Sequence, residues 1–311
     1  MKCVLIINPL SNNGNCMKHI ETILTASRQK LGEISVEYAS GFEEIREYSK
    51  KANLAGHDLV VAVGGDGTIN AVLNGFYDQE GKRISASSMG VIYTGTSPDF
   101  CKSYNIPLDH QEAIECLSAG FVKKIRPGSI NLQLNGQSHG RETRYFACCA
   151  NIGIGAGIAR DANYIRKYAG DLGGTFIALL KNLITYKSKK IFIEADRECD
   201  RIERLVNISV GRTPYIASGI KVDAGNIIDE EHFYLLIASG LSLSKLPGLV
   251  KQIYSGKIEN TSYLQLKLAE TIFLNSDDMA VEVEFDGDPA GYLPCSIELA
   301  KEGISLITNS N

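Results

Sequence analysis

The chain has 311 residues, which is enough for about two domains of ordinary size, each with its own hydrophobic core. Hydrophobic residues make up 44% of it and charged residues 22%, which is typical of a folded globular protein and excludes disorder or a coiled coil as a description of the whole chain. With 32 Lys and Arg against 36 Asp and Glu, the net charge is −4, so no basic field for nonspecific nucleic-acid binding is present and no nucleic-acid partner is expected.

The cysteines and the apolar runs predict the cellular location of the protein. The eight cysteines form no Cys-x-x-Cys pair, which favours reduced thiols in the cytoplasm, and the adjacent Cys148 and Cys149 are interpreted as core residues. The first apolar run, residues 3–7, is shorter than the ~7–15 residues of a secretory signal core. No run approaches the ~18 apolar residues of a membrane span. We therefore expect a cytoplasmic protein without a transmembrane segment that can visit the membrane periphery.

Short apolar runs alternate with helical patterns in residues 1–124. The expected strands are 3–7, 34–38, 58–63 and 89–93, and the expected helices are 17–31, 42–55 and 69–76. Continuous apolar strands such as Leu-Val-Val-Ala-Val at 59–63 are buried on both faces when helices lie between them in the chain. The pattern predicts an α/β domain with a doubly wound parallel sheet.

The rhythm changes after residue 124, where strand patterns dominate. The expected strands are 130–134, 145–149, 191–195, 205–210, 233–238, 263–268, 271–274, 281–285 and 296–299, with helices at 163–186 and 243–254. This predicts a second, mostly antiparallel β-rich domain with helices packed on it. We expect the first domain to span 1–124 and to be completed by a return of the chain near 297–311, the second to span 125–296, and a ligand cleft to lie between them.

The strongest local signal is Gly64-Gly65-Asp66-Gly67-Thr68, directly after an expected strand. Glycines let a backbone turn sharply and approach phosphate oxygens, and the N-terminus of the following helix adds N–H donors. Asp66 could hold Mg²⁺ or contact a nucleotide. The competing interpretation is a tight turn in which Asp66 caps the helix. The motif is neither a Walker loop nor a Gly-x-Gly-x-x-Gly fingerprint.

Two further polar loops follow neighbouring strands. Asn8-Pro9, with Gly14, comes after the first strand, and Gly95-Thr96-Ser97-Pro98-Asp99-Phe100 comes after the fourth. Since the carboxyl ends of parallel strands meet at one edge of a sheet, the three loops are expected to converge on one crevice.

Together these motifs resemble the catalytic domain of the diacylglycerol kinase family, in particular its bacterial soluble lipid-kinase branch, which is related to sphingosine kinases. The resemblance extends through most of the chain. It includes an Asn/Gly-rich strand at 146–156, the helix that follows it to residue 183, and a late segment, Asp286-Gly287-Asp288-Pro289 with Leu293-Pro294. Phosphofructokinases and NAD kinases share Gly-Gly-Asp-Gly-Thr, so the late segment narrows the resemblance to this family.

The resemblance implies Mg²⁺-dependent transfer of the γ-phosphate of ATP to a lipid hydroxyl, with the lipid at a membrane surface or in micelles. Asp66 and Asp288 would be catalytic, Asp288 standing where the family has the glutamate regarded as general base. The metal would be held in the second, acceptor-binding domain by Asp229 or Glu230, and a homodimer is compatible with the family. The nucleotide would be bound by Asn8, Ser11, Gly14, Ser40, Gly64, Gly65, Asp66, Gly67, Thr68 and Thr96.

The sequence departs from the family pattern at four places. Asp288 is about 1.5 Å shorter than glutamate, one C–C bond. Pro98 replaces an asparagine, Arg126-Pro127 stands where the family often has an active-site carboxylate, and residues 228–232 offer acids without the expected glycine, so Asp229 and Glu230 both remain candidates. Two alternatives therefore stay open. They are a kinase on the same scaffold with a non-lipid acceptor, and a nucleotide-binding regulator that has lost catalysis.

Overall fold

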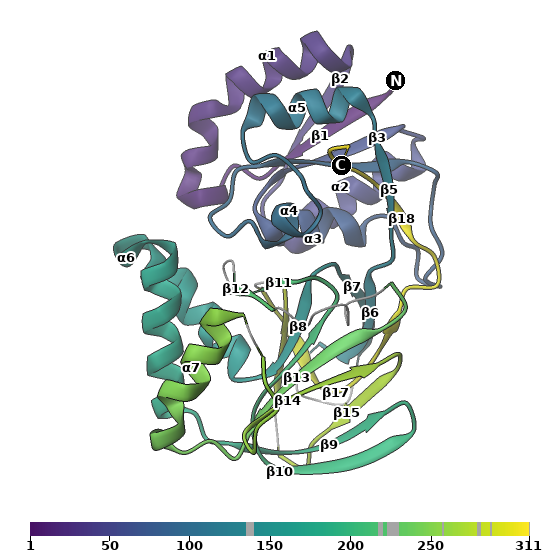
Figure 1. Cartoon of the computed structure of the whole chain (residues 1–311). Coiled ribbons are helices and arrows are strands. Elements are labelled where there is room, and N and C mark those ends of the chain that lie inside the picture. Colours follow the sequence, from purple (N-terminus) through teal and green to yellow (C-terminus); the bar gives the residue numbers. More distant parts are fainter. Residues whose placement is uncertain are drawn as a thin grey trace. The chain divides into compact units, whose positions relative to one another are not determined.

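The computed structural model describes residues 1–134, 140–216, 220–222, 230–256, 258–278, 281–286 and 288–310. The chain divides into two compact units (Figure 1). Unit 1 contains Met1–Pro127 together with Ala300–Asn311, and unit 2 contains Gly128–Leu299.

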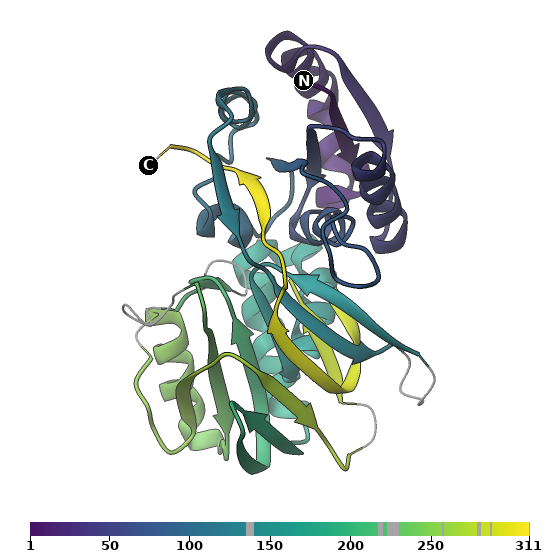
Figure 2. The same ribbon diagram turned by 90° about the vertical axis from the view of Figure 1, so that its right-hand side faces the viewer.

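Unit 1 is built on a six-stranded sheet in the order β2-β1-β3-β4-β18-β5. All neighbouring strands run parallel except β18 and β5, which are antiparallel. Figure 2 shows β18, in yellow, beside β5. The strand bounds are β1 Cys3–Ile7, β2 Ile34–Tyr38, β3 Leu59–Gly64, β4 Ser88–Tyr93, β5 Val122–Ile125 and β18 Ile304–Ile307.

Helices cover both faces of this sheet, which is why its central strands are apolar throughout. Every residue of β1 and β3 is buried. Helices α1 and α5 pack together over one face, with Leu5 and Val61 in their shared core, and α2 and α3 pack together. The helix bounds are η1 Ser11–His19, α1 Ile20–Leu31, α2 Phe42–Leu54, α3 Asp66–Asn74, α4 Asp99–Ser103 and α5 His110–Ala119. The expected doubly wound parallel sheet is confirmed.

Unit 2 is an antiparallel β structure that closes on itself. The strands pair in the order β14-β13-β10-β8-β16-β17-β15-β9, and β9 pairs back to β10, so the strands from β10 to β9 form a ring. Strand β6 pairs with β17 and β7. The bounds are β6 Gly128–Gln133, β7 Arg141–Phe146, β8 Cys149–Gly153, β9 Lys189–Ala195, β10 Glu198–Gly211, β13 Phe233–Ser239, β14 Leu264–Ala269, β15 Ile272–Asn275, β16 Glu282–Phe285 and β17 Asp288–Leu299.

Alternate residues of these strands fill the interior of the ring. Phe146, Phe233 and Phe285 lie in a single core cluster with aliphatic residues of every strand of the ring. This confirms the mostly antiparallel β-rich part of the expected fold. The remaining elements of unit 2 are α6 Ile154–Thr185, α7 Leu246–Ser255, the short 3₁₀ turn η3 Leu243–Lys245, and the two-residue strands β11 Tyr215–Ile216 and β12 Ile220–Lys221.

Helix α6 turns back on itself. The Asp161 carboxylate accepts hydrogen bonds from Lys181 Nζ over 3.0 Å and from Asn182 Nδ2 over 2.7 Å, although Asn182 is 21 residues further along the chain. A straight helix of that length would separate the two residues by about 30 Å, at 1.5 Å per residue. The helical path must therefore reverse between them, in a stretch that contains Gly170, Gly173 and Gly174. The expected single helix over 163–186 missed this reversal and began nine residues too late.

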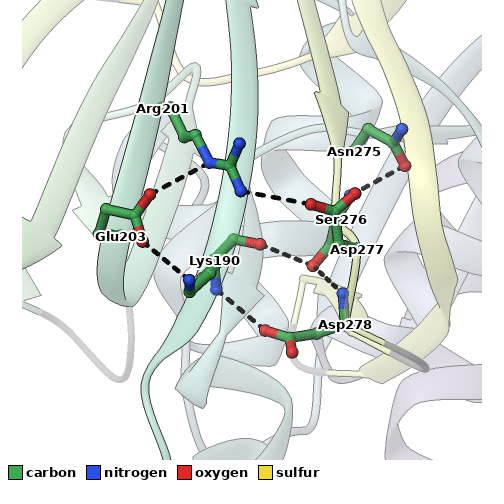
Figure 3. Close-up of polar contacts among 7 residues, drawn as sticks. All are labelled: Lys190, Arg201, Glu203, Asn275, Ser276, Asp277 and Asp278. Carbon is green, nitrogen blue, oxygen red and sulfur yellow. Dashed lines mark hydrogen bonds and ion pairs between the residues drawn. The ribbon is translucent and has the colours of Figure 1, made fainter.

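An exposed network of ion pairs and hydrogen bonds joins β9, β10 and the turn after β15 (Figure 3). Glu203 pairs with both Arg201 and Lys190, Arg201 also pairs with Asp277, and the Lys190 N–H donates to Asp278. Because these side chains are exposed, the pairs add little to stability. They join neighbouring segments, namely β9, β10 and the turn after β15. Within the described residues, no helix is long and apolar enough to cross a bilayer.

Candidate nucleotide site

The polar loops after β1, β3 and β4 lie side by side at one edge of the unit 1 sheet. The three strands are adjacent and parallel, and their ladder continues into the loops, where the Asn8 N–H donates to the Val63 carbonyl over 3.0 Å and the Thr94 N–H to the Gly64 carbonyl over 2.9 Å. From β1 the chain crosses to β2 on one side and later to β3 on the other. Ligands of open α/β sheets bind at such a switch point, so this edge is the candidate site.

A side-chain hydrogen bond joins the first loop to the glycine loop. Asn8 Nδ2 donates to Thr68 Oγ1 over 3.0 Å, and Asn8 Oδ1 accepts the Leu10 N–H over 3.0 Å. Thr68 is buried in the first turns of α3. Asn8 therefore fixes both its own loop and the start of α3, and two residues that sequence reasoning placed at the nucleotide are in direct contact.

A second hydrogen bond joins the first loop to the loop after β4. Thr94 Oγ1 donates to Ser11 Oγ over 3.0 Å, and both hydroxyl residues are buried. After Ser11 the chain takes left-handed conformations at Asn12, Asn13 and Gly14, with φ of 51°, 55° and 82°. Asparagine and glycine are the residues that adopt these angles most readily, which explains the Asn-Asn-Gly sequence at the turn.

The glycine loop leads directly into helix α3, which begins at Asp66, earlier than the expected start at residue 69. Gly65 is the N-cap and no side chain caps the helix, so the interpretation of Asp66 as a capping residue is wrong. Asp66 lies in the first turn and accepts the Asp99 N–H on Oδ2 over 3.3 Å. The first backbone N–H groups of a helix have no partner within the helix, and together with the helix dipole they favour an anion such as phosphate.

Gly65 and Gly95 bring the loops after β3 and β4 into close approach. A Cβ atom on Gly95 would lie 2.5 Å from Gly65 Cα and 2.7 Å from the Tyr93 hydroxyl oxygen, closer than real Cβ atoms come to other atoms. A Cβ atom on Gly64 would overlap the Thr68 side chain. Gly64 and Gly95 therefore have no room for a side chain.

At the candidate site the buried Tyr93 side chain lies near the Asp66 carboxylate. Tyr93, the last residue of β4, is buried, and burial together with the nearby Asp66 carboxylate raises its pKa well above the usual value for tyrosine. Tyr93 thus stays neutral beside Asp66 at physiological pH. Sequence reasoning missed Tyr93, because an aromatic residue at the end of an apolar strand is indistinguishable from core.

Two of the expected nucleotide residues lie at the rim. Ser40 and Thr96 are exposed, after β2 and β4 respectively, and the Ser40 N–H donates to the Glu44 carboxylate over 2.8 Å at the start of α2. The hydrogen bonds described above join Asn8, Ser11, Asp66 and Thr68 to one another's loops, and do not include Ser40 or Thr96.

Of the three candidate residues of unit 2, Asp288 and Glu230 lie within the described part of the chain. Asp288 is the first residue of β17, where it pairs with Phe285. Asp229 lies outside the described residues, and Glu230 is exposed, with its carbonyl oxygen accepting from Arg212 over 3.0 Å. The described residues contain no group of three side chains suited to hold a metal.

A row of buried and half-buried polar side chains crosses unit 2, and sequence reasoning did not predict their contacts. Asn151 of β8 donates from Nδ2 to Glu284 of β16 over 2.8 Å, and its Oδ1 accepts from Ser209 of β10 over 2.6 Å and from Asn207 over 3.2 Å. Glu284 is only 5% exposed. In a strand with alternating polarity such a glutamate is expected to face water. The only sequence signal was the asparagine of the Asn/Gly-rich strand.

Two departures from the family pattern have structural roles here. Pro98 is the N-cap of α4, and its carbonyl accepts the Lys102 N–H over 3.0 Å, while the Asp99 N–H still reaches Asp66. Arg126 donates from Nε to the Ala300 carbonyl over 2.8 Å, which ties the chain leaving unit 1 to the chain returning to it.

Comparisons with known proteins show the family of the chain. The family model described as the diacylglycerol kinase catalytic domain matches residues 2–130, and the model described as the YegS C-terminal NAD kinase beta sandwich-like domain matches residues 148–308. The chain belongs to the diacylglycerol kinase family. Relatives of this family include the diacylglycerol kinase of Staphylococcus saprophyticus, 26% identical over 90% of this chain and 83% of that protein. The diacylglycerol kinase of Bacillus subtilis is 25% identical over 93% of this chain and 90% of that protein.

Solved structures of the diacylglycerol kinase family and its neighbours share the fold. A crystal structure of a diacylglycerol kinase from Bacillus anthracis has a TM-score of 0.69 and 19% identity, and covers 99% of this chain and 97% of that chain. A yeast NADH kinase crystallised with NADH has a TM-score of 0.56 at 13% identity, over 100% of this chain and 84% of that chain. The two-part architecture is therefore common to kinases with different acceptors.

Proposed function

We propose that this protein transfers the γ-phosphate of ATP, with Mg²⁺, to a hydroxyl of diacylglycerol or a similar lipid. The observation that carries the proposal is the joining of three loops at the sheet edge by the pairs Asn8–Thr68, Ser11–Thr94 and Asp66–Asp99. The first turn of α3 lies within that arrangement, and a helix N-terminus suits the phosphates of a nucleotide. Family membership supports the lipid acceptor.

The residues at the glycine loop fit a magnesium ion bound together with the nucleotide. Mg²⁺ usually keeps several waters and is held by one or two carboxylates plus phosphate oxygens, so the Asp66 carboxylate at the phosphate-binding end of α3 is a suitable donor. When bound, the ion neutralises charge that develops on the transferred phosphoryl group. Glu230 stays a separate candidate for holding an ion in unit 2, where it is exposed.

In the proposed reaction the acceptor hydroxyl oxygen forms a bond to the γ-phosphorus as the bond between that phosphorus and the bridging oxygen of ADP breaks. Asp288 takes the hydroxyl proton, as general base. The N-terminus of α3 and the Asn8–Thr68 pair hold the phosphates in position. Positioning and electrostatic stabilisation supply most of the catalysis of phosphoryl transfer. ADP and the phosphorylated lipid leave.

The test is transfer of label from γ-³²P-ATP, with Mg²⁺, to diacylglycerol in mixed micelles, with glycerol as a soluble acceptor in a parallel arm. We expect labelled phosphatidic acid, and a loss of at least ~10²-fold in rate for Asp288→Asn, the range attributed to general base catalysis. Asp66→Asn should also lower the rate, because it removes the carboxylate proposed to hold Mg²⁺. Asp200→Asn, at an exposed aspartate of unit 2, serves as the control and should keep the wild-type rate.

Other outcomes point to the alternatives. Label in glycerol and none in diacylglycerol would identify a kinase for a soluble acceptor. ATP binding that depends on Asp66, without transfer to either acceptor, would overturn the kinase proposal in favour of a nucleotide-binding regulator.

A further inference from the structure

The side chain of Asp286 binds three successive backbone amides of a distant segment. Asp286 Oδ2 accepts the Ala147 N–H over 2.9 Å, and Oδ1 accepts the N–H groups of Cys148 and Cys149 over 3.0 and 3.1 Å. The Asp286 N–H in turn donates to the Cys149 carbonyl over 3.1 Å. We call this arrangement, Asp286 with the backbone of 147–149, the Asp286 clamp.

The clamp accounts for a break in a predicted strand. Apolar residues 145–149 were expected to form one continuous strand, but β7 ends at Phe146 and β8 begins at Cys149. The amides of Ala147 and Cys148 point to the carboxylate of Asp286 in place of a neighbouring strand. Cys148 and Cys149 are buried, as expected for core residues.

Asp286 also shapes the hairpin that leads to Asp288. It follows β16 directly and has a φ of 50°, in the left-handed region that aspartate, asparagine and glycine tolerate best. Two residues connect β16 to β17, and Phe285 pairs with Asp288 across them. The clamp therefore ties the hairpin that carries the candidate base to the start of β8.

Among the described residues of unit 2, Asp196 makes a similar arrangement with two successive amides, away from any proposed chemistry. Asp196 connects β9 to β10, again through two residues, with a φ of 49°. Its carboxylate accepts the N–H groups of Glu270 over 3.0 Å and Thr271 over 2.9 Å, and its own N–H donates to the Thr271 carbonyl over 3.1 Å. Because both hairpins use one device, its contribution to stability can be separated from any contribution to catalysis.

We propose that Asp286 is a positioning residue of the phosphoryl transfer: its clamp fixes the first residues of β17 and thereby the place of Asp288. This rests on the proposed function, in which Asp288 is the general base. Misplacement of a reacting group by ~1 Å can lower a rate by about 10²-fold, so a hairpin that has lost this clamp should fold and still react slowly.

The experiment compares Asp286→Asn with Asp196→Asn, because asparagine keeps the left-handed turn but offers one acceptor oxygen in place of two. Both variants should lose a similar few degrees of melting temperature. Only Asp286→Asn should lower kcat for lipid phosphorylation, by about 10²-fold, with KM for ATP within about twofold of wild type. An equal kcat loss in both variants, or a parallel rise in KM for ATP, would reduce the clamp to a structural role and overturn the proposal.

Hydrogen exchange of the intact protein supplies a readout that needs no activity. Peptides covering the start of β17 should exchange faster in Asp286→Asn and at the wild-type rate in Asp196→Asn. Unchanged exchange there overturns the positioning role even if the wild type phosphorylates no lipid, in which case the proposed function fails separately. If Asp288→Asn kept the wild-type kcat, Asp288 would not be the general base. That result would overturn both the role of Asp288 and the positioning role of Asp286.

Discussion

Asn8 and Thr68 lie sixty residues apart in the chain, and their side chains meet where β1 and β3 both end, with Asn8 Nδ2 donating to Thr68 Oγ1 over 3.0 Å. The bond holds the loop after β1 against the first turns of α3, whose N–H groups face the candidate phosphate site. The contact therefore joins the two loops directly, through their own side chains.

Removing this bond should weaken ATP binding. For Thr68→Val, which removes the hydroxyl at nearly constant volume, we expect a loss of about tenfold in ATP affinity, equivalent to a hydrogen bond worth ~1.4 kcal/mol. Asn8→Ala should lose a similar amount, and the double variant less than the product of the two losses, because both remove the same bond. Isothermal titration calorimetry measures the affinities. Thr308→Val, at another buried threonine of unit 1, should bind ATP normally.

The close approach of Gly65 and Gly95 predicts a second sensitive position. Gly95→Ala places a Cβ 2.5 Å from Gly65 Cα and should push the loops after β3 and β4 apart. We expect ATP affinity to fall by more than ~10-fold, since these are the loops proposed to bind the phosphates. The control is Gly32→Ala, with a φ of 85° and no atom within 4 Å of the added methyl. It should cost roughly 1 kcal/mol of stability and leave ATP affinity unchanged. Equal effects of the two variants on binding would contradict the steric argument.

The reversal of α6 should depend on pH through Asp161. Burial alone would raise the pKa of this carboxyl, but hydrogen bonds from Lys181 and Asn182 and the charge of Lys181 outweigh it and hold the pKa below its ordinary value of 3.8. Because the pKa of Asp161 is lower in the folded than in the unfolded state, its carboxylate stabilises the fold at pH values above the unfolded-state pKa. This stabilisation is lost as the pH falls through the folded-state pKa.

Urea denaturation at pH 7 and pH 3 tests this dependence. The wild type should lose more stability between the two pH values than Asp161→Asn, whose side chain does not titrate. Asp200→Asn, at an exposed aspartate, should behave as the wild type does. An identical pH dependence in wild type and Asp161→Asn would show that the contact with Lys181 and Asn182 adds nothing.

The eight cysteines predict a simple labelling result. Seven are buried and Cys199 is exposed. Burial raises the pKa of Cys3 and of Cys295 to about 12, so neither thiol forms the reactive thiolate at neutral pH. Ellman's reagent should modify one thiol per native chain quickly and all eight after denaturation. Cys199→Ser should abolish the fast phase, and a fast phase that persists in this variant would contradict the burial of the other thiols.

The sequence was most informative where structure follows from local patterns. The apolar runs at β1 and β3 predict buried parallel strands because every residue in them is apolar, and both strands are buried throughout. The loops after them were recognisable because glycine and asparagine mark turns, and their convergence followed from the geometry of parallel strands. The pairs Asn8–Thr68 and Ser11–Thr94 could not be predicted, since no spacing rule relates residues so far apart in the chain.

Long-range hydrogen bonds account for what the sequence could not predict. The break between β7 and β8 arises because Asp286, far along the chain, binds the amides there. The reversal of α6 depends on the contact between Asp161 and Asn182, which periodicity cannot reveal. Glu284 was indistinguishable from a solvent-facing strand residue until Asn151 was seen to bind it.

The place of β18 in the unit 1 sheet has a consequence for how the protein is made. The strand lies between β4 and β5, although the whole of unit 2 separates it from them in the chain. During synthesis on the ribosome, β4 and β5 must therefore wait with unpaired edges until residues 304–307 emerge, and exposed strand edges are prone to wrong pairing. Unit 2 is continuous from Gly128 to Leu299 and can complete its own sheet earlier. We expect the later-synthesised unit to complete its sheet first, and the sheet of unit 1 to be completed last, when β18 enters between β4 and β5.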